Sequence, residues 1–168
     1  MSREQFWDAR KQMDVAGLTD IQRAARFFVV IKESFGADMH SFCLKSRNME
    51  KTIDYITSIS KRLNTVVIEN LDFEHILKTY DRNETLFYLD PPYYGAEKYY
   101  KIAFAQGEHI RLKTALDKIN GRFILSYNDC EFVRELYKEY NMIEIYRMSN
   151  LVKKDKKPRY KELLIKNY

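Results

Sequence analysis

Short apolar runs alternate with helical segments in the second half of the chain, and this alternation constrains the fold more than any other feature. The runs 65–68, 85–89 and 123–126 are rich in β-branched and aromatic residues and predict buried strands. The segments between them, 73–81 and 105–119, carry apolar residues at helical spacing. Because strands that alternate with helices form parallel sheets with helices on their faces, we expect an α/β fold.

The C-terminal part of the chain departs from this alternation. Residues 142–148 and 160–165 are two strand-like runs joined by a basic loop, with no helical segment between them. Two strands joined without a helix are expected to pair antiparallel, here at an edge of the sheet.

The N-terminal part has a helical pattern. Capping boxes, in which a hydroxyl and a glutamine side chain satisfy free backbone donors, begin at Ser2 and at Thr19. An apolar helical face follows Thr19, and a second one occupies residues 49–63. We expect a helical region at 1–62 and an α/β portion with a C-terminal antiparallel hairpin at 63–168.

Composition narrows the class of protein. Apolar residues make up 45% of the chain and aromatic residues 14%, which is enough for a packed core and excludes general disorder. The formal net charge of +5 favours a polyanionic partner, although this signal is weak alone. The sequence has no N-terminal signal region and no apolar run of the roughly 18 residues that a membrane span needs. We therefore expect a soluble cytoplasmic protein without a membrane partner.

Residue types that form disulfides or bind metals are not arranged for either task. Cys43 and Cys130 lie far apart and form no CxxC pair, so we expect reduced, buried thiols. His40, His75 and His109 have no metal-ligand spacing with cysteine or carboxylate residues, so no metal site is expected.

Asp90-Pro91-Pro92-Tyr93 is the motif most suited to chemistry. It directly follows the strand-like run 85–89, and ligands of open parallel sheets bind beyond the carboxyl ends of strands. Two prolines fix the backbone and donate no backbone hydrogen bond, so they form a rigid loop whose carbonyls can accept. Asp90 adds a carboxylate acceptor and Tyr93 a flat aromatic face. The set suits an exocyclic amino group on a flat base, whereas the alternative is a tight turn after a strand.

The chemistry of such an amino group explains this fit. The N6 atom of adenine is a poor nucleophile because its lone pair is delocalised into the ring. Two acceptors around the amino group favour a pyramidal geometry and localise the lone pair for in-line attack on a sulfonium methyl, so catalysis rests on positioning and electrostatics. Because the atom is inaccessible inside a duplex, the base is expected to be flipped out and stacked against Tyr93.

Several segments, in the same order along the chain, resemble the Dam-like D12 class of adenine-N6 DNA methyltransferases. Residues 86–93 are similar to the fourth motif of that family, and residues 70–73 to the third. Residues 124–129 resemble a strand end with serine and asparagine, and residues 162–167 resemble the last strand. Residues 19–36 resemble the helical target-recognition insert. The fourth motif carries most of the weight.

The resemblance implies a class I S-adenosylmethionine-dependent methyltransferase sheet, which is Rossmann-like, and methyl transfer to adenine N6 in double-stranded DNA. The resemblance also implies a role in restriction-modification, in which a methyltransferase acts beside a cognate restriction enzyme. The implied catalytic residues are Asp90, Pro91, Pro92 and Tyr93. The implied contacts to S-adenosylmethionine are Asp72, Phe73 and Asp90. Asp72 is equally placed to cap a helix that begins at Phe73.

One family feature is missing. Members of the family hold the methionine part of the cofactor with a Phe-x-Gly-x-Gly loop, and no Gly-x-Gly occurs in these 168 residues. The chain therefore resembles the later portion of the family, incomplete at the N-terminal side of the sheet. We expect a truncated or split form, completed by a second polypeptide that supplies the motif, and no activity of the lone chain.

Two sets of residues are candidates for DNA binding. The loop 150–161 concentrates basic residues, either as a solvated hairpin loop or as a set of phosphate contacts. Tyr94 could line the pocket for the target base or pack the core. The DNA-binding candidates are Tyr94, Lys153, Lys154, Lys156, Lys157 and Arg159.

Two alternative functions remain open. The Asp-Pro-Pro-Tyr motif also occurs in RNA methyltransferases that act on base amino groups, although the helical insert favours the DNA group. The missing glycine-rich loop is also compatible with a non-catalytic DNA-binding remnant. Cofactor binding would separate the remnant from an enzyme.

Overall fold

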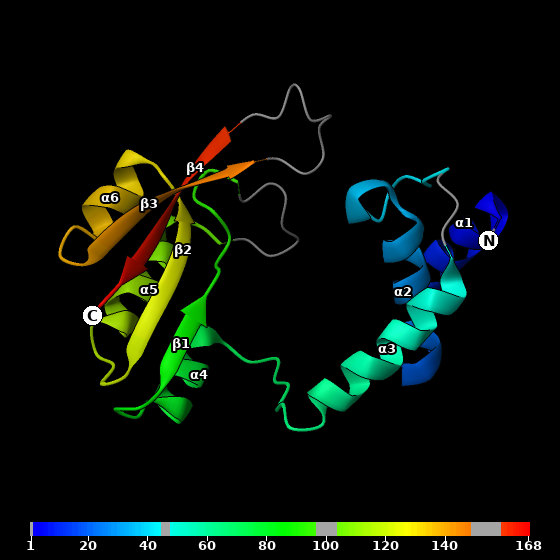
Figure 1. Cartoon of the computed structure of the whole chain (residues 1–168), viewed down its shortest axis with the longest axis horizontal. Coiled ribbons are helices and arrows are strands. Elements are labelled where there is room, and N and C mark those ends of the chain that lie inside the picture. Colours follow the sequence, from blue (N-terminus) through cyan, green and yellow to red (C-terminus); the bar gives the residue numbers. More distant parts are fainter. Residues whose placement is uncertain (1, 45–47, 97–103, 149–158) are drawn as a thin grey trace. The chain divides into compact units, whose positions relative to one another are not determined.

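A computed structural model of the chain describes residues 2–44, 48–96, 104–148 and 159–168. The chain divides into two compact units, Met1–Val67 and Ile68–Tyr168. The first unit is helical, and the second combines a small mixed sheet with helices (Figure 1). The chain therefore has a mixed α/β fold.

The helices of the first unit are α1 (Arg3–Gln12), α2 (Asp20–Glu33), the 3-10 turn η1 (Phe35–Ala37) and α3 (Met49–Leu63). The first two, α1 and α2, begin at the predicted capping boxes. Ser2 and Thr19 each accept a hydrogen bond from the backbone of the glutamine three residues later, and each glutamine side chain accepts one in return. Phe6 and Val30 are fully buried. None of the helices in the described ranges is long and apolar enough to cross a membrane.

The second unit is built on a four-stranded sheet with the order β1-β2-β4-β3. Its strands are β1 (Leu86–Leu89), β2 (Arg122–Asn128), β3 (Asn141–Met148) and β4 (Arg159–Lys166). β1 and β2 are parallel, whereas β4 is antiparallel to both β2 and β3. The predicted C-terminal hairpin is therefore confirmed. It contributes one inner strand and one edge strand.

The strand predicted at 65–68 is wrong. Residues 66–70 have no regular structure, and Val67 and Ile68 are 75% and 77% exposed. A β-branched run forms a strand only where a neighbouring strand pairs with its backbone, and no described strand pairs with this run. The segment instead lies where the two units join.

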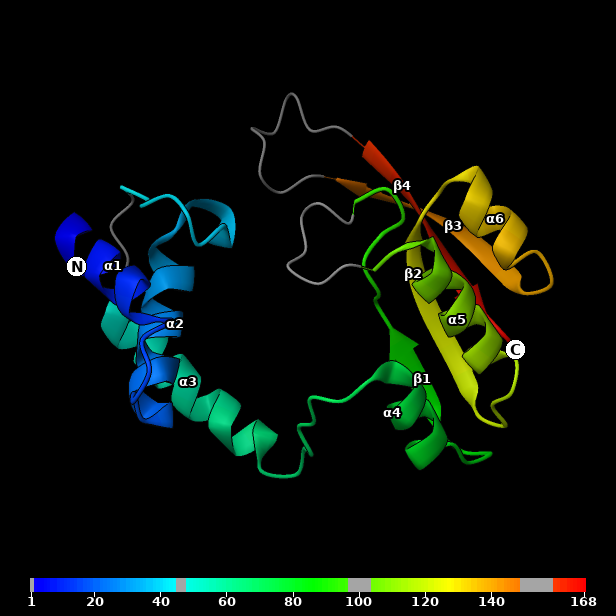
Figure 2. The same cartoon turned by 180° about the vertical axis from the view of Figure 1, so that it is seen from behind.

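The helices described in the second unit all lie on one face of the sheet, as Figures 1 and 2 show from opposite sides. They are α4 (Phe73–Tyr80), α5 (Gln106–Leu116) and the short α6 (Glu131–Leu136), which was not predicted from the sequence. Phe123, Leu125 and Tyr127 are fully buried under them, because alternate residues of a strand share one face. The expectation of helices on both faces is not met by the described residues of this unit.

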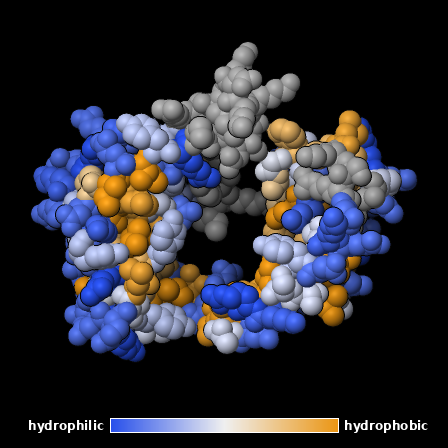
Figure 3. Space-filling model, viewed as in Figure 1, coloured by the Kyte–Doolittle hydropathy of each residue, from blue (hydrophilic) through white to orange (hydrophobic). Residues whose placement is uncertain are grey.

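The opposite face of the sheet is apolar and exposed. Figure 3 shows hydrophobic side chains gathered along it. Leu86 and Tyr88 of β1 are 56% and 67% exposed, and Ile143 of β3 is 47% exposed. These side chains form an exposed apolar patch on this face of the sheet.

Two loops that precede β1 and β2 hold the start of the parallel pair together. The carboxylate of Asp81 accepts hydrogen bonds from the backbone N–H groups of Asn120 (2.9 Å) and Gly121 (2.8 Å). The backbone N–H of Arg122 donates to the carbonyl of Thr85 at 2.8 Å. These bonds set the register in which Leu86 pairs with Arg122.

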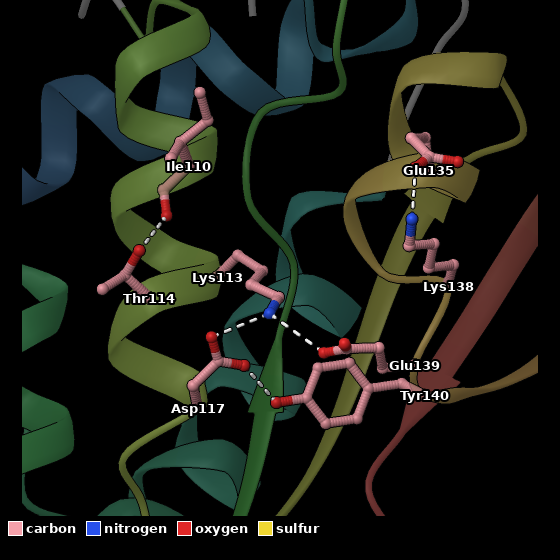
Figure 4. Close-up of polar contacts among 8 residues, drawn as sticks. All are labelled: Ile110, Lys113, Thr114, Asp117, Glu135, Lys138, Glu139 and Tyr140. Carbon is pink, nitrogen blue, oxygen red and sulfur yellow. Dashed lines mark hydrogen bonds and ion pairs between the residues drawn. The ribbon is translucent and has the colours of Figure 1, made fainter.

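A polar cluster ties the end of α5 to the loop before β3 (Figure 4). The Lys113 ammonium group contacts Asp117 at 2.8 Å and Glu139 at 3.6 Å. The hydroxyl of Tyr140 donates to Asp117 at 2.5 Å. Burial, followed by the hydrogen bond to Asp117, raises the pKa of Tyr140. The cluster connects the helical layer to the hairpin.

Both cysteines are free thiols, and each is half-buried rather than buried as predicted. Among the described residues, no group of three His, Cys, Asp or Glu side chains is placed to hold a metal ion.

The loop geometry predicts that alanine in place of glycine destabilises the fold at Gly121 but not at Gly107. A Cβ at Gly121 would lie 2.8 Å from the Thr85 carbonyl and 2.9 Å from the Arg82 carbonyl, so backbone has to move. We expect Gly121→Ala to lower the free energy of unfolding by about 1–3 kcal/mol. Gly107→Ala is the control, because a Cβ there meets nothing within 4 Å. Urea unfolding followed by circular dichroism measures both, and equal stability of the two variants would contradict the prediction.

Candidate functional site

The carboxyl ends of β1 and β2 bring two predicted segments together. Because the two strands are parallel, with Leu89 opposite Leu125, their following residues meet at the same edge of the sheet. Ser126 is 5% exposed, and its hydroxyl donates a hydrogen bond to Oδ1 of Asp90 at 2.8 Å. Residues 36 positions apart in sequence thus form one polar site.

The carboxylate of Asp90 is accessible although it is anchored. Asp90 is exposed, whereas Pro91 and Pro92 beside it are half-buried. Among the described contacts, the hydroxyl of Ser126 engages Oδ1 and no side chain engages Oδ2. The second oxygen is therefore available to accept a hydrogen bond from a ligand.

A cavity of about 260 Å³ lies beside this carboxylate. Residues from the start of α4, the end of β1 and the middle of α5 line it. They are Phe73, Tyr88, Leu89, Asp90, Pro91 and Leu112. Apolar walls with one carboxylate suit a flat heterocycle whose edge carries an amino group. Two of the three predicted cofactor contacts, Phe73 and Asp90, line this cavity.

Asp72, the third predicted cofactor contact, is engaged by the protein itself. Oδ1 accepts a hydrogen bond from the backbone N–H of Glu74 at 3.0 Å, which caps α4. Oδ2 accepts one from Arg111 at 2.6 Å. The Glu74 amide and then Arg111 lower the pKa of Asp72. The capping role expected from the sequence is observed, and a cofactor contact by Asp72 stays a prediction.

Tyr93 packs against the core next to the motif. Its ring centroid lies 6.2 Å from that of Tyr127, with the planes tilted by 39°. Burial, followed by the negative charges of Glu162 and Asp90, raises the pKa of Tyr93 to about 12. The phenol is therefore neutral at pH 7 and presents an uncharged ring.

The ring of Tyr94 packs against residues of the core. Its ring stacks on Phe132 with the centroids 4.2 Å apart and contacts the edge of His109 at 5.4 Å. The side-chain amide of Asn128 donates to the Tyr94 carbonyl at 3.0 Å. These contacts from β2, α5 and α6 hold the backbone that follows the motif, and a DNA contact by Tyr94 stays a prediction.

A family model for the D12 class of N6 adenine-specific DNA methyltransferases matches residues 1–151 of the chain. The chain belongs to this family. The match confirms the resemblance seen in the ordered motifs and identifies a methyltransferase family whose substrate class is DNA. No curated protein matches the chain.

Most of the basic loop of this family member lies outside the described residues. Lys153, Lys154, Lys156 and Lys157 belong to the range 149–158, and of Arg159 only the backbone at the start of β4 is described. Lys161 is described, and its ammonium group contacts Asp129 and Glu144, each at 3.0 Å.

Two residues of α5 that were not among the predicted site residues support the site. His109 is fully buried, and its Nδ1 atom lies 2.5 Å from the Tyr127 hydroxyl. Arg111 places its guanidinium carbon 4.3 Å from the ring centroid of Phe73. Single polar residues on a helix give no signal in sequence, because their partners depend on how α5 packs.

Four charged side chains join α6 to the base of the hairpin. Arg134 donates to both oxygens of Asp129, at 2.5 Å and 2.8 Å, and also contacts Glu144. Lys161 contacts the same two carboxylates. The hydrogen bond from Arg134, reinforced by Lys161, lowers the pKa of Asp129 to about 2. The cluster anchors both strands from which the basic loop extends.

This depressed pKa predicts an acid-dependent contribution to stability. A carboxyl group with a lower pKa in the folded state stabilises the fold above its unfolded pKa, and the contribution is lost as pH falls through the folded pKa. We expect the stability difference between wild type and Asp129→Asn to shrink between about pH 4 and pH 2. Urea unfolding over this range tests it, with Glu84→Gln as an exposed control. A difference that does not change with pH would contradict the assignment.

Proposed function

We propose that the chain is the catalytic portion of an enzyme that transfers a methyl group from S-adenosylmethionine to adenine N6 in double-stranded DNA. The observation that carries this proposal is the Asp90 carboxylate, which Ser126 anchors at the carboxyl end of β1 beside the cavity that Phe73 lines. The family match supports adenine in DNA as the target.

The residues of the loop have distinct roles in this proposal. Oδ2 of Asp90 and the carbonyl of Pro91 accept the two hydrogens of the target amino group, and the hydroxyl of Ser126 keeps the carboxylate in place. Pro92 keeps the loop rigid. The neutral ring of Tyr93 stacks on the flipped base. Catalysis then rests on orientation and on acceptors placed before the reaction.

The cavity beside Asp90 suits the adenine end of the cofactor. Phe73, Leu89 and Leu112 offer apolar contact, and Asp90, whose Oδ2 atom accepts from the target amino group, lines the same cavity. When bound, S-adenosylmethionine supplies an electrophilic methyl group. The described residues around the cavity include no glycine-rich loop that would hold the methionine end.

We propose that the sheet is part of a class I, Rossmann-like sheet completed by a further polypeptide with the glycine-rich loop. β1 is an edge strand of the described sheet, so its outer backbone groups can pair with another strand. The apolar face with Leu86, Tyr88 and Ile143 can be covered by helices of that polypeptide.

DNA contacts are assigned to two further regions in this proposal. The helical region 1–62 serves target recognition. The basic loop contacts phosphates close to the site, because β4, the strand that follows the loop, pairs with the end of β2, where Asn128 lies opposite Glu162. Tyr94 contributes near the target base.

A non-catalytic DNA-binding remnant is the second candidate. The missing Gly-x-Gly loop favours it, because a chain that holds only the adenine end of the cofactor binds it weakly. The two candidates differ in whether methylation appears once the loop is supplied in a second polypeptide.

Reconstitution tests the proposed function. The full chain, alone and with a separately expressed polypeptide that carries a Phe-x-Gly-x-Gly loop, is assayed for transfer of labelled methyl groups to DNA adenine. We expect no activity of the chain alone and activity of the pair. Asp90→Ala should lower the activity of the pair by about 100-fold or more, with little change in DNA affinity.

Glu84→Ala is the matched control, because Glu84 is an exposed carboxylate that precedes the same strand at its opposite end. Near-normal turnover by Asp90→Ala would overturn the catalytic assignment. DNA binding without methylation by the pair would favour the remnant.

The basic loop has its own prediction. Replacing Lys153, Lys154, Lys156 and Lys157 with glutamine should weaken binding to all DNA sequences alike and flatten its dependence on salt. Binding isotherms at several salt concentrations measure both effects. A loss confined to one sequence, with the salt slope unchanged, would mark the loop as a base reader instead.

A further inference from the structure

Arg111 of α5 connects the two helices that line the cavity beside Asp90, α4 and α5. The Arg111 guanidinium group contacts Asp72 at 2.6 Å and Glu74 at 3.6 Å, both at the start of α4. It also contacts Glu108 of its own helix at 3.1 Å. Three carboxylates thus surround the guanidinium group of Arg111 and fix the orientation of its plane.

The same guanidinium group covers the ring of Phe73. Its central carbon lies 4.3 Å from the ring centroid, which is within the range of a cation–π contact. Phe104 lies against the ring as well, with the centroids 6.2 Å apart and the planes tilted by 57°. Phe73 is half-buried and lines the cavity. Arg111 itself is not among the residues that line it.

An ordinary surface ion pair connects fewer parts of the structure than Arg111 does. Arg23 pairs with Asp20 on its own helix, and such exposed pairs contribute little to stability. Arg111 instead links α4 to α5 and contacts an aromatic wall of the cavity. A ring fixed before a ligand arrives loses less conformational freedom when the ligand stacks on it, so binding is tighter.

We propose that Arg111 is a positioning residue for the adenine end of the cofactor, and that it acts by holding the Phe73 ring as a rigid wall of the cavity. The proposal rests on the proposed function, because that function assigns this cavity to the cofactor. Arg111 does not touch the ligand. It acts through Phe73 alone.

Adenosine is the probe that tests this role, titrated into the full chain and followed by NMR chemical shifts. Arg111→Lys keeps the positive charge but loses the planar group that stacks on the ring. We expect the dissociation constant for adenosine to rise about three- to five-fold in Arg111→Lys. Arg122→Lys is the matched control, because Arg122 contacts the ring of Tyr168 at 5.6 Å, away from the cavity.

A double-mutant cycle separates positioning from a general effect on the fold. Phe73→Ala should weaken adenosine binding, and Arg111→Lys should weaken it no further in the Phe73→Ala background. A merely structural role would lower the melting temperature and leave the affinity for adenosine unchanged at low temperature.

The outcomes distinguish this proposal from the one on which it rests. If wild type binds adenosine and Arg111→Lys binds it equally well, the role of Arg111 is overturned and the cavity assignment stands. Additive losses in the double mutant also overturn the role of Arg111. If wild type does not bind adenosine, the cavity assignment and this proposal both fall.

Discussion

The parallel pairing of β1 with β2 is the constraint on which the rest of the candidate site depends. It places the residue after Leu89 next to the end of β2, where the Ser126 hydroxyl meets Asp90. The bonds from Asp81 to the loop before β2, and the close approach at Gly121, hold this pairing at the opposite end of the strands. A site at one end of the sheet therefore depends on a tight loop at the other.

The sheet has two different faces, and the difference bears on what the unit can do alone. Helices bury Phe123, Leu125 and Tyr127 on one face. The other face leaves Leu86 and Tyr88 exposed. Because both residues belong to β1, which is also an edge strand, open backbone and open apolar surface coincide on the strand that precedes Asp90. Polypeptide added there would lie next to the candidate site.

Polar side chains around the site connect the elements that position it. Asp72 caps α4 and pairs with Arg111, and Arg111 in turn covers the ring of Phe73. The charged cluster of Asp129 and Arg134 anchors the hairpin. Each links two elements whose relative position sets the shape of the cavity or the origin of the basic loop. Support for the site thus extends well beyond the motif.

The sequence by itself determined the local features. The capping boxes at Ser2 and Thr19, the strand before Asp90 and the resemblance to the family all follow from short-range patterns. The structure confirms the capping boxes and the strand, and the match over residues 1–151 confirms the family. Such features can be predicted from the sequence because capping, strand periodicity and a proline-fixed loop depend on neighbouring residues in the sequence.

Tertiary structure alone decided which distant groups meet. Residues 65–68 have the composition of a strand, yet no strand in the described ranges pairs with them and they form no strand. The bond from Ser126 to Asp90 spans 36 residues, and the contact of Arg111 with Asp72 spans 39. Neither follows from a local pattern, because each depends on strand register and on how helices pack over the sheet. The physical reason is that a backbone pairs and a side chain finds its partner only after the chain has folded back on itself.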